Sequence, residues 1–365
     1  MSVQCGIIGL PNVGKSTIFS CLTRLSVDAE NYPFCTIEPN VSSVAVPDER
    51  LYLLAEMACS ENTVPSFCDF VDIAGLVSGA SKGEGLGNRF LSHIREADAL
   101  IHVVRCFSDE NIVHVNGTVD PVSDVRVIQL ELVLADISVL EKYLAKNSKS
   151  AKLSNSKESL ARINLVEFIL DQLNGNTPSV RSLNLTDDQR DLVSSLNLLT
   201  DKPMFYCANV DEASLTLNRH LSEISSLAKD EGVDLFVLNA AAEKELMDFS
   251  DNERREFLAD MGFEDSGLNR LVRSAYTLLG RCSFFTVGPK ESRSWTIPIG
   301  TKAQSAAGVI HSDMEKGFIR AEVVSYSDYI AYKGMQGAKE AGKVRLEGKE
   351  YIVKDGDIIH FRFNV

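Results

Sequence analysis

The sequence predicts an α/β protein in which one domain carries a helical insertion and is followed by a smaller, strand-rich module. Three observations support this fold class. Short apolar runs alternate with helix-like segments over most of residues 1–280, as in a parallel sheet covered by helices. Residues 125–200 interrupt the alternation with apolar side chains spaced three and four apart. From residue 281 onward the apolar runs are short and are separated by turn residues.

Composition limits the classes of partner. The 365 residues are 44% hydrophobic and carry a net charge of −14, which argues against a basic surface for nucleic acid. We therefore expect no sequence-specific binding to DNA. No apolar run approaches the roughly 18 residues of a membrane span, and the N-terminus lacks the pattern of a signal peptide. We expect a cytoplasmic protein with no membrane association.

The first apolar run leads into a turn that matches the phosphate-loop template G-x-x-x-x-G-K-[ST]. Gly9, Gly14, Lys15 and Ser16 fill the template, and a helix-like run follows. The backbone N–H groups of such a turn face inward and bind phosphate oxygens. Lys15 is the predicted catalytic cation, and Ser16 is a predicted Mg²⁺ ligand. The residues predicted to bind the nucleotide in this loop are Asn12, Val13, Gly14, Lys15, Ser16 and Thr17.

A proline-containing loop within residues 26–50 carries Thr36. In phosphate-loop switches, a threonine from such a loop completes the Mg²⁺ shell and senses the γ-phosphate, and Thr36 is the candidate. Taken alone it would be a loop threonine with no role, but the phosphate loop upstream favours the switch role. The neighbouring Cys35 lies in a polar segment, where it is either inert or a reactive thiol.

The next apolar strand ends in the pattern D-x-x-G. Asp72 is predicted to bind Mg²⁺ in the outer shell, and the Gly75 N–H to contact the γ-phosphate. The alternative is an ordinary strand that ends in a polar turn. Four glycines within residues 79–87 predict a segment that changes shape with the nucleotide.

Leu76 follows this pattern at the position where small GTPases place a water-orienting glutamine. Leucine has no hydrogen-bonding group, so we expect slow intrinsic hydrolysis or a water positioned by another side chain. His114, in a loop after the next buried strand, is one candidate for that catalytic role. The alternative is that His114 is simply an exposed loop histidine.

The strand over residues 202–208 ends in Asn209, Val210, Asp211 and Glu212, where GTPases carry N-K-x-D to read guanine. Glutamate is one methylene longer than aspartate and would need the base to move to keep both hydrogen bonds. Each charge-assisted bond contributes about 1.5–3 kcal/mol, so losing the pair would weaken guanine binding roughly a hundredfold. Adenine lacks the 2-amine and loses nothing. We therefore predict adenine as the base, bound by Asn209, Val210 and Glu212.

Residues 125–200 predict an antiparallel helical hairpin inserted into the nucleotide domain. The first apolar seam is Leu130, Val133, Ile137, Leu140 and Leu144, and the second is Ile163, Val166, Leu170 and Leu173. A polar break at 146–157 separates the two. The seams contain too few heptads to predict dimerisation, so we expect self-packing within a monomer.

The last domain, residues 281–365, predicts a β-grasp, ubiquitin-like module. Strands are predicted at Ser283–Val287, Arg293–Ile297, Lys343–Leu346, Tyr351–Val353 and Ile358–Phe363, with a helix over Ala306–Lys316. The module shows no catalytic constellation, so we interpret it as an interaction module.

These motifs together resemble the YchF family of Obg-related, ribosome-associated ATPases, called Obg-like ATPases in eukaryotes. The likeness covers essentially the whole chain and rests on the phosphate loop, residues 32–40, 72–77 and 79–87, the Asn209–Glu212 segment, and a C-terminal stretch similar to a TGS domain. It implies a Ras-like P-loop NTPase domain with an inserted coiled coil, ATP preferred over GTP, slow hydrolysis, Mg²⁺ and ribosome binding. It also implies a backbone contact from Val210 to adenine.

The predicted domains are therefore an OBG-type nucleotide domain over 1–124 and 201–280, the hairpin over 125–200, and the TGS module over 281–365. The predicted function is a Mg²⁺-dependent switch that hydrolyses ATP slowly, and GTP less well, and associates with the ribosome or its large subunit. Two alternatives stay open: an Obg-type GTPase, or a ribosome-associated scaffold that binds nucleotide with negligible hydrolysis.

Overall fold

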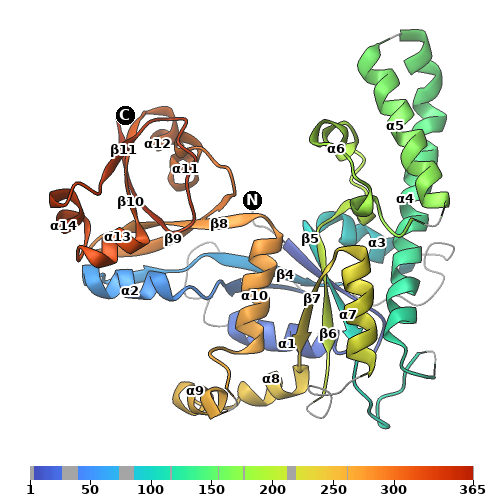
Figure 1. The fold of residues 1–365 in the computed structure, drawn as a ribbon, viewed down its shortest axis with the longest axis horizontal. Helices are drawn as coiled ribbons and strands as arrows, with labels where there is room; N and C mark the ends of the chain where they lie inside the picture. Colours follow the sequence, from blue (N-terminus) through green and yellow to red (C-terminus); the bar gives the residue numbers. More distant parts are fainter. Residues whose placement is uncertain are drawn as a thin grey trace. The chain divides into compact units, whose positions relative to one another are not determined.

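The structure, a computed structural model, contains two compact units (Figure 1). The first unit falls within Met1–Arg24, Ile37–Ser42 and Asp69–Leu268, and the second within Leu25–Thr36, Ser43–Cys68 and Asn269–Val365. The structure describes residues 4–26, 40–73, 86–115, 117–154, 156–175, 177–211, 219–260 and 262–364, and for 86–89, 152–154 and 251 the backbone alone.

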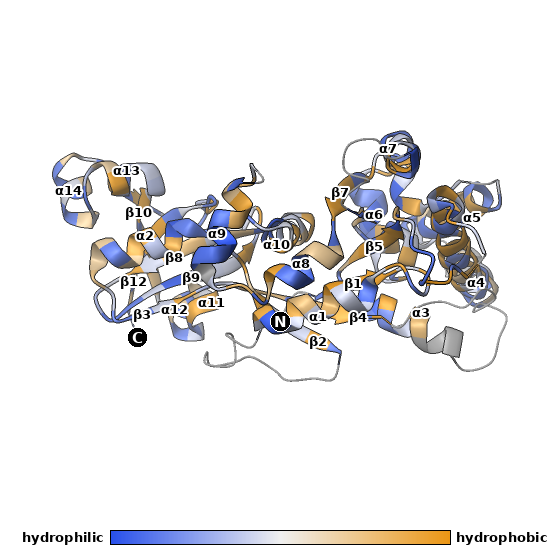
Figure 2. Cartoon of the chain, turned by 90° about the horizontal axis from the view of Figure 1, so that it is seen from below, coloured by the Kyte–Doolittle hydropathy of each residue, from blue (hydrophilic) through white to orange (hydrophobic). Residues whose placement is uncertain are grey.

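The first unit is organised around a six-stranded sheet in the order β2-β4-β1-β5-β6-β7. Its strands are β1 (Gln4–Ile8), β2 (Val41–Ala45), β4 (Phe67–Asp72), β5 (Ala99–Arg105), β6 (Met204–Asn209) and β7 (Asp234–Leu238). The pairings from β4 to β7 are all parallel. Every residue of β5 and β6 is buried, as expected for strands covered on both faces. Figure 2 shows the contrast between hydrophobic strands and helices of mixed hydropathy.

The parallel register brings the carboxyl ends of four strands to one edge of this sheet. Ile8 pairs with His102, Arg105 with Asn209, and Asn209 with Leu238. The loops that follow β1, β5, β6 and β7 therefore start side by side, at the edge where open α/β sheets bind ligands.

The surrounding helices give the first unit its α/β character. They are α1 (Lys15–Ser26), α3 (Leu86–Glu96), α7 (Arg219–Glu231), α8 (Ala240–Leu246) and α9 (Asp251–Asp260), and α10 (Gly267–Leu278) runs into the second unit. Among the described residues, no helix has both the length and the apolar character that crossing a bilayer requires.

The predicted helical hairpin is present as α4 (Pro121–Ser154) and α5 (Lys157–Asn174), which pack along each other in Figure 1. Val133, Leu140, Val166 and Leu173 are buried in its core, as the seams predict. Leu130 is the exception, because its side chain is 57% exposed. At that level α4 packs on the nucleotide domain instead of α5, and the buried side chains there are Val125, Ile128 and Leu132.

The predicted polar break at 146–157 is wrong in extent. Helix α4 continues to Ser154, and α5 begins at Lys157 with Ser156 as its N-cap. Lys146, Lys149 and Ser150 are exposed side chains on this long helix, so polarity alone did not indicate a loop.

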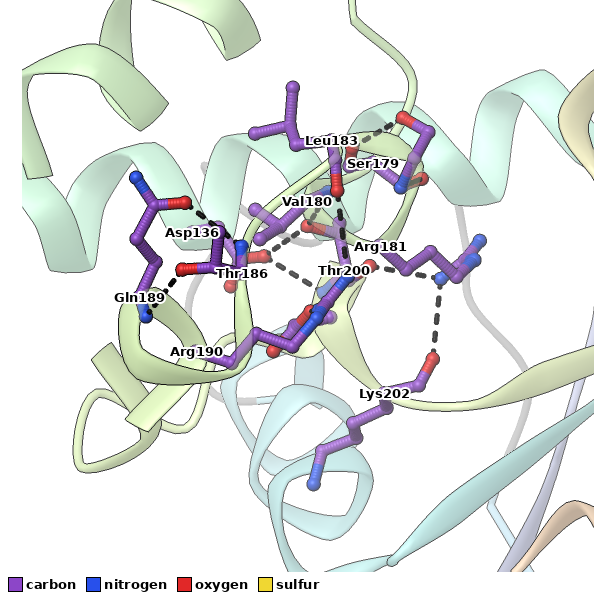
Figure 3. Close-up of polar contacts among 12 residues, drawn as sticks. Asp136, Ser179, Val180, Arg181, Leu183, Thr186, Gln189, Arg190, Thr200 and Lys202 are labelled. Atoms are coloured by element: carbon purple, nitrogen blue, oxygen red, sulfur yellow. Dashed lines mark hydrogen bonds and ion pairs between the residues drawn. The ribbon is translucent and has the colours of Figure 1, made fainter. Parts of the chain in front are cut away.

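A buried polar cluster fixes the foot of the hairpin to the strand β6 (Figure 3). The carboxylate of Asp136 on α4 is fully buried and accepts hydrogen bonds from the Leu199 and Thr200 amides at 2.8 Å and from the Thr200 hydroxyl at 2.7 Å. Arg181 donates to the carbonyl oxygens of Thr200 and Lys202. These bonds hold the segment that leads into β6 against the middle of α4.

The second unit contains a second six-stranded sheet, ordered β11-β10-β12-β8-β9-β3. Its strands are β3 (Asn62–Val64), β8 (Arg281–Val287), β9 (Glu291–Pro298), β10 (Phe318–Ser325), β11 (Arg345–Glu347) and β12 (Asp357–Phe363). Helix α11 (Ala303–Ile310) covers one face, and α2 (Glu49–Ala58), α13 (Tyr326–Ala331) and α14 (Met335–Glu340) contribute to the core on the other. The predicted α/β class with a C-terminal strand-rich module is thus confirmed.

Four details of this unit differ from the sequence prediction. The predicted helix over Ala306–Lys316 is two helices, α11 and α12 (Ser312–Lys316), because the chain is extended at His311. The predicted strand Tyr351–Val353 makes only one bridge, from Ile352 to Lys302. Strand β10 was not predicted. Helix α2 and strand β3 also join this unit, although they lie far upstream in the sequence.

We predict that Asp136→Asn lowers the stability of the full chain without unfolding it. The amide nitrogen cannot accept a hydrogen bond, so one buried donor loses its partner at a cost of about 1–3 kcal/mol. Thermal unfolding followed by circular dichroism measures the shift. An unchanged midpoint would contradict the role assigned to this cluster.

Candidate nucleotide site

The loop between β1 and α1 has the backbone that a phosphate loop requires. Gly9 and Gly14 have φ angles of 148° and 101°, a region that side chains other than glycine rarely adopt. A Cβ atom on Gly9 would lie 2.5 Å from the Val103 carbonyl oxygen, and one on Gly14 would lie 2.2 Å from Asn209 Nδ2. Both positions therefore admit only glycine in this conformation.

Lys15 begins α1, and its ammonium group folds back over the loop. Nζ donates to the Leu10 carbonyl oxygen at 2.6 Å, and the residue is 7% exposed. Burial lowers the pKa of Lys15 to about 8, while the Asp72 carboxylate acts in the opposite direction. A partly desolvated cation at this position is suited to bind an anion, which would restore its charged form.

Asp72 ends β4 and carries a buried carboxylate oxygen. Among the residues that the structure describes, Oδ1 has no hydrogen-bond partner. Burial raises the pKa of Asp72, and the nearby Lys15 opposes that shift. A buried oxygen without a partner fits a hydrated divalent cation, and the exposed Ser16 at the start of α1 is the second candidate ligand.

The described residues contain no group of three or more His, Cys, Asp or Glu side chains able to hold a metal alone. A hydroxyl, an outer-shell carboxylate and phosphate oxygens are the usual ligands of Mg²⁺ at phosphate sites. Ser16 and Asp72 therefore fit Mg²⁺ that binds with a nucleotide, and they do not fit a permanent metal centre.

Asn209 connects the phosphate loop to the loop after β7. Its Nδ2 donates to the Val13 carbonyl oxygen at 3.0 Å, and its Oδ1 accepts from the Ala240 amide at 3.0 Å. The side chain is 5% exposed, and Val13 is 1% exposed. One buried amide thus fixes the spacing between two loops of the site.

These loops enclose a pocket of about 700 Å³ in the first unit. It is lined by the phosphate-loop residues Asn12, Gly14, Lys15, Ser16 and Thr17, by Phe107, Ser108, Asp109 and Ile112 after β5, by Asn209, Val210 and Asp211 after β6, and by Asn239, Ala240, Ala241, Ala242, Lys244 and Glu245 at α8. The volume is in the range of small-molecule sites.

The structure brings most of the predicted nucleotide residues to this pocket. Val13 lies beneath the loop and supports it through its carbonyl group. Cys35, Thr36, Gly75, Leu76 and Glu212 lie outside the described residues. Phe107, Ser108, Asp109 and Ile112 were not predicted, because an apolar strand end followed by a polar loop carries no recognisable motif.

His114 is buried, in contrast to the exposed loop histidine that was the alternative prediction. Its Nε2 lies 2.9 Å from Asp124 Oδ2, and both side chains are 3% exposed. Burial raises the pKa of Asp124, whereas the hydrogen bond with His114 lowers it. In this conformation Nε2 is engaged, so the catalytic role of His114 remains a prediction that requires the pair to open.

Comparisons with known proteins place this geometry in a family. A family model described as a 50S ribosome-binding GTPase matches residues 4–131, and a model of the YchF GTPase C-terminal region, described as a protein of unknown function, matches 282–364. The ribosome-binding ATPase YchF of Pasteurella multocida is 51% identical over 365 residues, which are the full length of both chains. The chain belongs to the YchF family.

Other members of the YchF family agree with this assignment. The ribosome-binding ATPase YchF of Bacillus subtilis is 50% identical over 368 residues, with both chains fully covered. The structure of the Schizosaccharomyces pombe YchF GTPase superposes with a TM-score of 0.90 at 38% identity, covering 99% of this chain and 98% of that one. A GTP binding protein from Pyrococcus horikoshii, at 22% identity and a TM-score of 0.63, shares the fold; the match covers 99% of this chain and 100% of that chain.

We predict that ATP affinity falls as the pH rises above about 8. Burial lowers the Lys15 pKa to about 8 in the unliganded protein. Above that pH the amine is neutral and must take up a proton to bind the triphosphate, which costs about tenfold in affinity per pH unit. Titrations of labelled ATP between pH 7 and 9.5 measure the slope.

Lys15→Arg is the matched control, because a guanidinium keeps its charge over this range. We expect weaker binding that does not change with pH in this variant. A flat profile in the unmodified protein, or the same slope in both proteins, would contradict the assignment to Lys15.

Proposed function

We propose that this protein binds ATP with Mg²⁺ and hydrolyses it slowly, as a nucleotide switch that associates with the ribosome. The observation that supports this most directly is the phosphate loop with Lys15 over it and the buried Asp72 carboxylate at the neighbouring strand end. Relatives named ribosome-binding ATPases, with about half of their residues identical over the full length, support the same function.

The residues of this chain supply mainly positioning and charge. Ser16 and Asp72 would hold Mg²⁺, with Thr36 as a further proposed ligand. The bound ion would draw negative charge from the phosphate oxygens. Lys15 neutralises the charge that develops on the γ-phosphoryl group as water attacks. To do so, Nζ exchanges the Leu10 carbonyl oxygen, 2.6 Å away, for a phosphate oxygen.

We further propose that the loop after β6 selects adenine. The Val210 amide already donates to the Leu238 carbonyl oxygen at 2.9 Å. This N–H is therefore not available to donate to an acceptor atom of the base. We propose that the Val210 carbonyl oxygen accepts from the 6-amino group of adenine. Guanine presents an oxygen at that position, and two acceptors would repel each other. Glu212, where GTPases carry aspartate, is proposed to disfavour guanine further.

A GTPase is the second candidate. One matching family model is described as a 50S ribosome-binding GTPase, and the S. pombe relative is named a YchF GTPase. Asn209 is retained from the guanine-reading motif, but both ends of its amide group are engaged by Val13 and Ala240. Its position therefore supports the two loops and does not by itself favour guanine.

The source of slow hydrolysis is proposed to be the absence of a ready water-orienting group. Leu76 has no hydrogen-bonding side chain, and His114 is paired with Asp124. Opening of this pair would free Nε2 to orient water, which offers a route for stimulation by a partner such as the ribosome.

We predict that ATP binds at least tenfold more tightly than GTP, about 1.4 kcal/mol, because of the carbonyl contact and the altered motif. Dissociation constants for both nucleotides, measured side by side with Mg²⁺, test this. Tighter GTP binding would favour the GTPase. Phosphate release with and without ribosomes then separates a slow ATPase from a scaffold, since a scaffold releases none in either condition.

A further inference from the structure

The loop after β5, residues 106–115, forms one wall of the nucleotide pocket without carrying a nucleotide motif. Phe107, Ser108, Asp109 and Ile112 line the same pocket as the phosphate loop. Most of this stretch has no regular secondary structure, so contacts from outside must hold it in place. In the described part of the chain, the Cys106 amide donates to the Asn209 carbonyl oxygen at 2.8 Å, and the Ser108 amide donates to Asp211 Oδ2 at 3.4 Å. Three further contacts come from different parts of the first unit.

Arg105, the last residue of β5, is the first contact. Its side chain is one of the largest that are fully buried, with 1% exposed. The guanidinium donates to the carbonyl oxygens of Ile112 at 3.0 Å, Asp109 at 3.2 Å and Phe107 at 3.3 Å. It also lies 4.6 Å from the centre of the Phe107 ring. A buried cation that donates to three carbonyl groups fixes the curvature of the loop.

The second contact comes from the phosphate loop itself. Asn12, which has a φ of 62°, donates from Nδ2 to the Val113 carbonyl oxygen at 3.0 Å. The pocket wall and the phosphate loop are thus directly hydrogen-bonded, and a shift in one changes the other.

The third contact comes from the helical hairpin. Asp124 lies in the first turn of α4 and binds His114 through Oδ2, with both side chains buried. Asp124 Oδ1 has no hydrogen-bond partner among the described residues. Within that part of the chain, the carboxylate is therefore held by its hydrogen bond to His114. Helix α4 therefore holds the end of the pocket wall.

We propose that Arg105 and Asp124 are positioning residues for the nucleotide site: Arg105 shapes the pocket wall, and Asp124 fixes its end to the hairpin helix. The expected effect on catalysis rests on the proposed ATPase function. A pocket wall displaced by about 1 Å can lower the rate of hydrolysis up to a hundredfold. It also makes α4 a mechanical connection between the inserted hairpin and the phosphate loop through His114, Val113 and Asn12.

The test compares Arg105→Lys and Asp124→Asn with the unmodified full chain. Lysine keeps the charge but cannot donate to three carbonyl groups in one plane, and asparagine keeps the volume but loses the carboxylate charge. Hydrogen–deuterium exchange of the amides of residues 107–115 reports the position of the wall directly. We expect at least tenfold faster exchange there in both variants, with the β5 and β6 amides unchanged.

ATP kinetics provide the second readout. For Asp124→Asn we expect kcat to fall about tenfold while the ATP dissociation constant changes less than threefold, because the site of the phosphates is retained. For Arg105→Lys we expect kcat to fall and the ATP dissociation constant to rise, because Phe107 and Ile112 belong to the pocket wall. Asp136→Asn is the matched control: another buried carboxylate on α4, it contacts Leu199 and Thr200 and not the loop (Figure 3).

The control is expected to lower the unfolding temperature with loop exchange and kcat unchanged. The proposal is overturned if the two variants exchange like the unmodified protein, or if Asp136→Asn changes the loop and kcat as much as Asp124→Asn. If the unmodified protein hydrolyses no ATP, the proposed function fails, and the exchange measurements still decide whether Arg105 and Asp124 position the wall.

Discussion

The nucleotide pocket depends on the side-chain amide of Asn209. It is buried between two loops and supplies a donor to one and an acceptor to the other, so it sets their separation. The same Nδ2 atom occupies the space that a Cβ on Gly14 would need. A glycine in the phosphate loop and an asparagine about two hundred positions later are therefore parts of one packing arrangement. The sheet makes this possible, because β6 ends beside β5, which itself lies beside β1.

Buried polar groups hold two of the segments that connect the strands of this sheet. Arg105 holds the wall after β5, and Asp136 holds the segment before β6. A buried charge is costly unless it is fully hydrogen-bonded, and such bonds require one geometry. These groups therefore give the loops a defined position that apolar packing alone would not specify. Asp72 differs, because one of its buried oxygens has no partner among the described residues, as expected for a group that completes its bonds with a ligand.

The sequence predicted the elements whose signals are local. The phosphate loop follows from its spacing, the buried strands from continuous apolar runs, and the hairpin from two periodic seams. The position of α2 and β3 in the second unit could not be predicted, because β3 pairs with β9 more than two hundred residues downstream. The prediction that Leu130 belongs to the core of the hairpin was wrong, because α4 packs on the nucleotide domain along its first turns and on α5 only further along. The position of Phe107 in the pocket lining and the three carbonyl contacts of Arg105 could not be predicted, because neither leaves a pattern in the sequence.

The measurement that tests this account most directly is ATP binding by Asn209→Leu, which is uncharged and nearly isosteric. The substitution removes both hydrogen bonds and leaves the Val13 carbonyl and the Ala240 amide buried without this partner, at about 1–3 kcal/mol each. We expect at least a tenfold loss of ATP affinity with the circular dichroism spectrum retained. An affinity within twofold of the unmodified protein would contradict the claim that this amide holds the two loops of the site together.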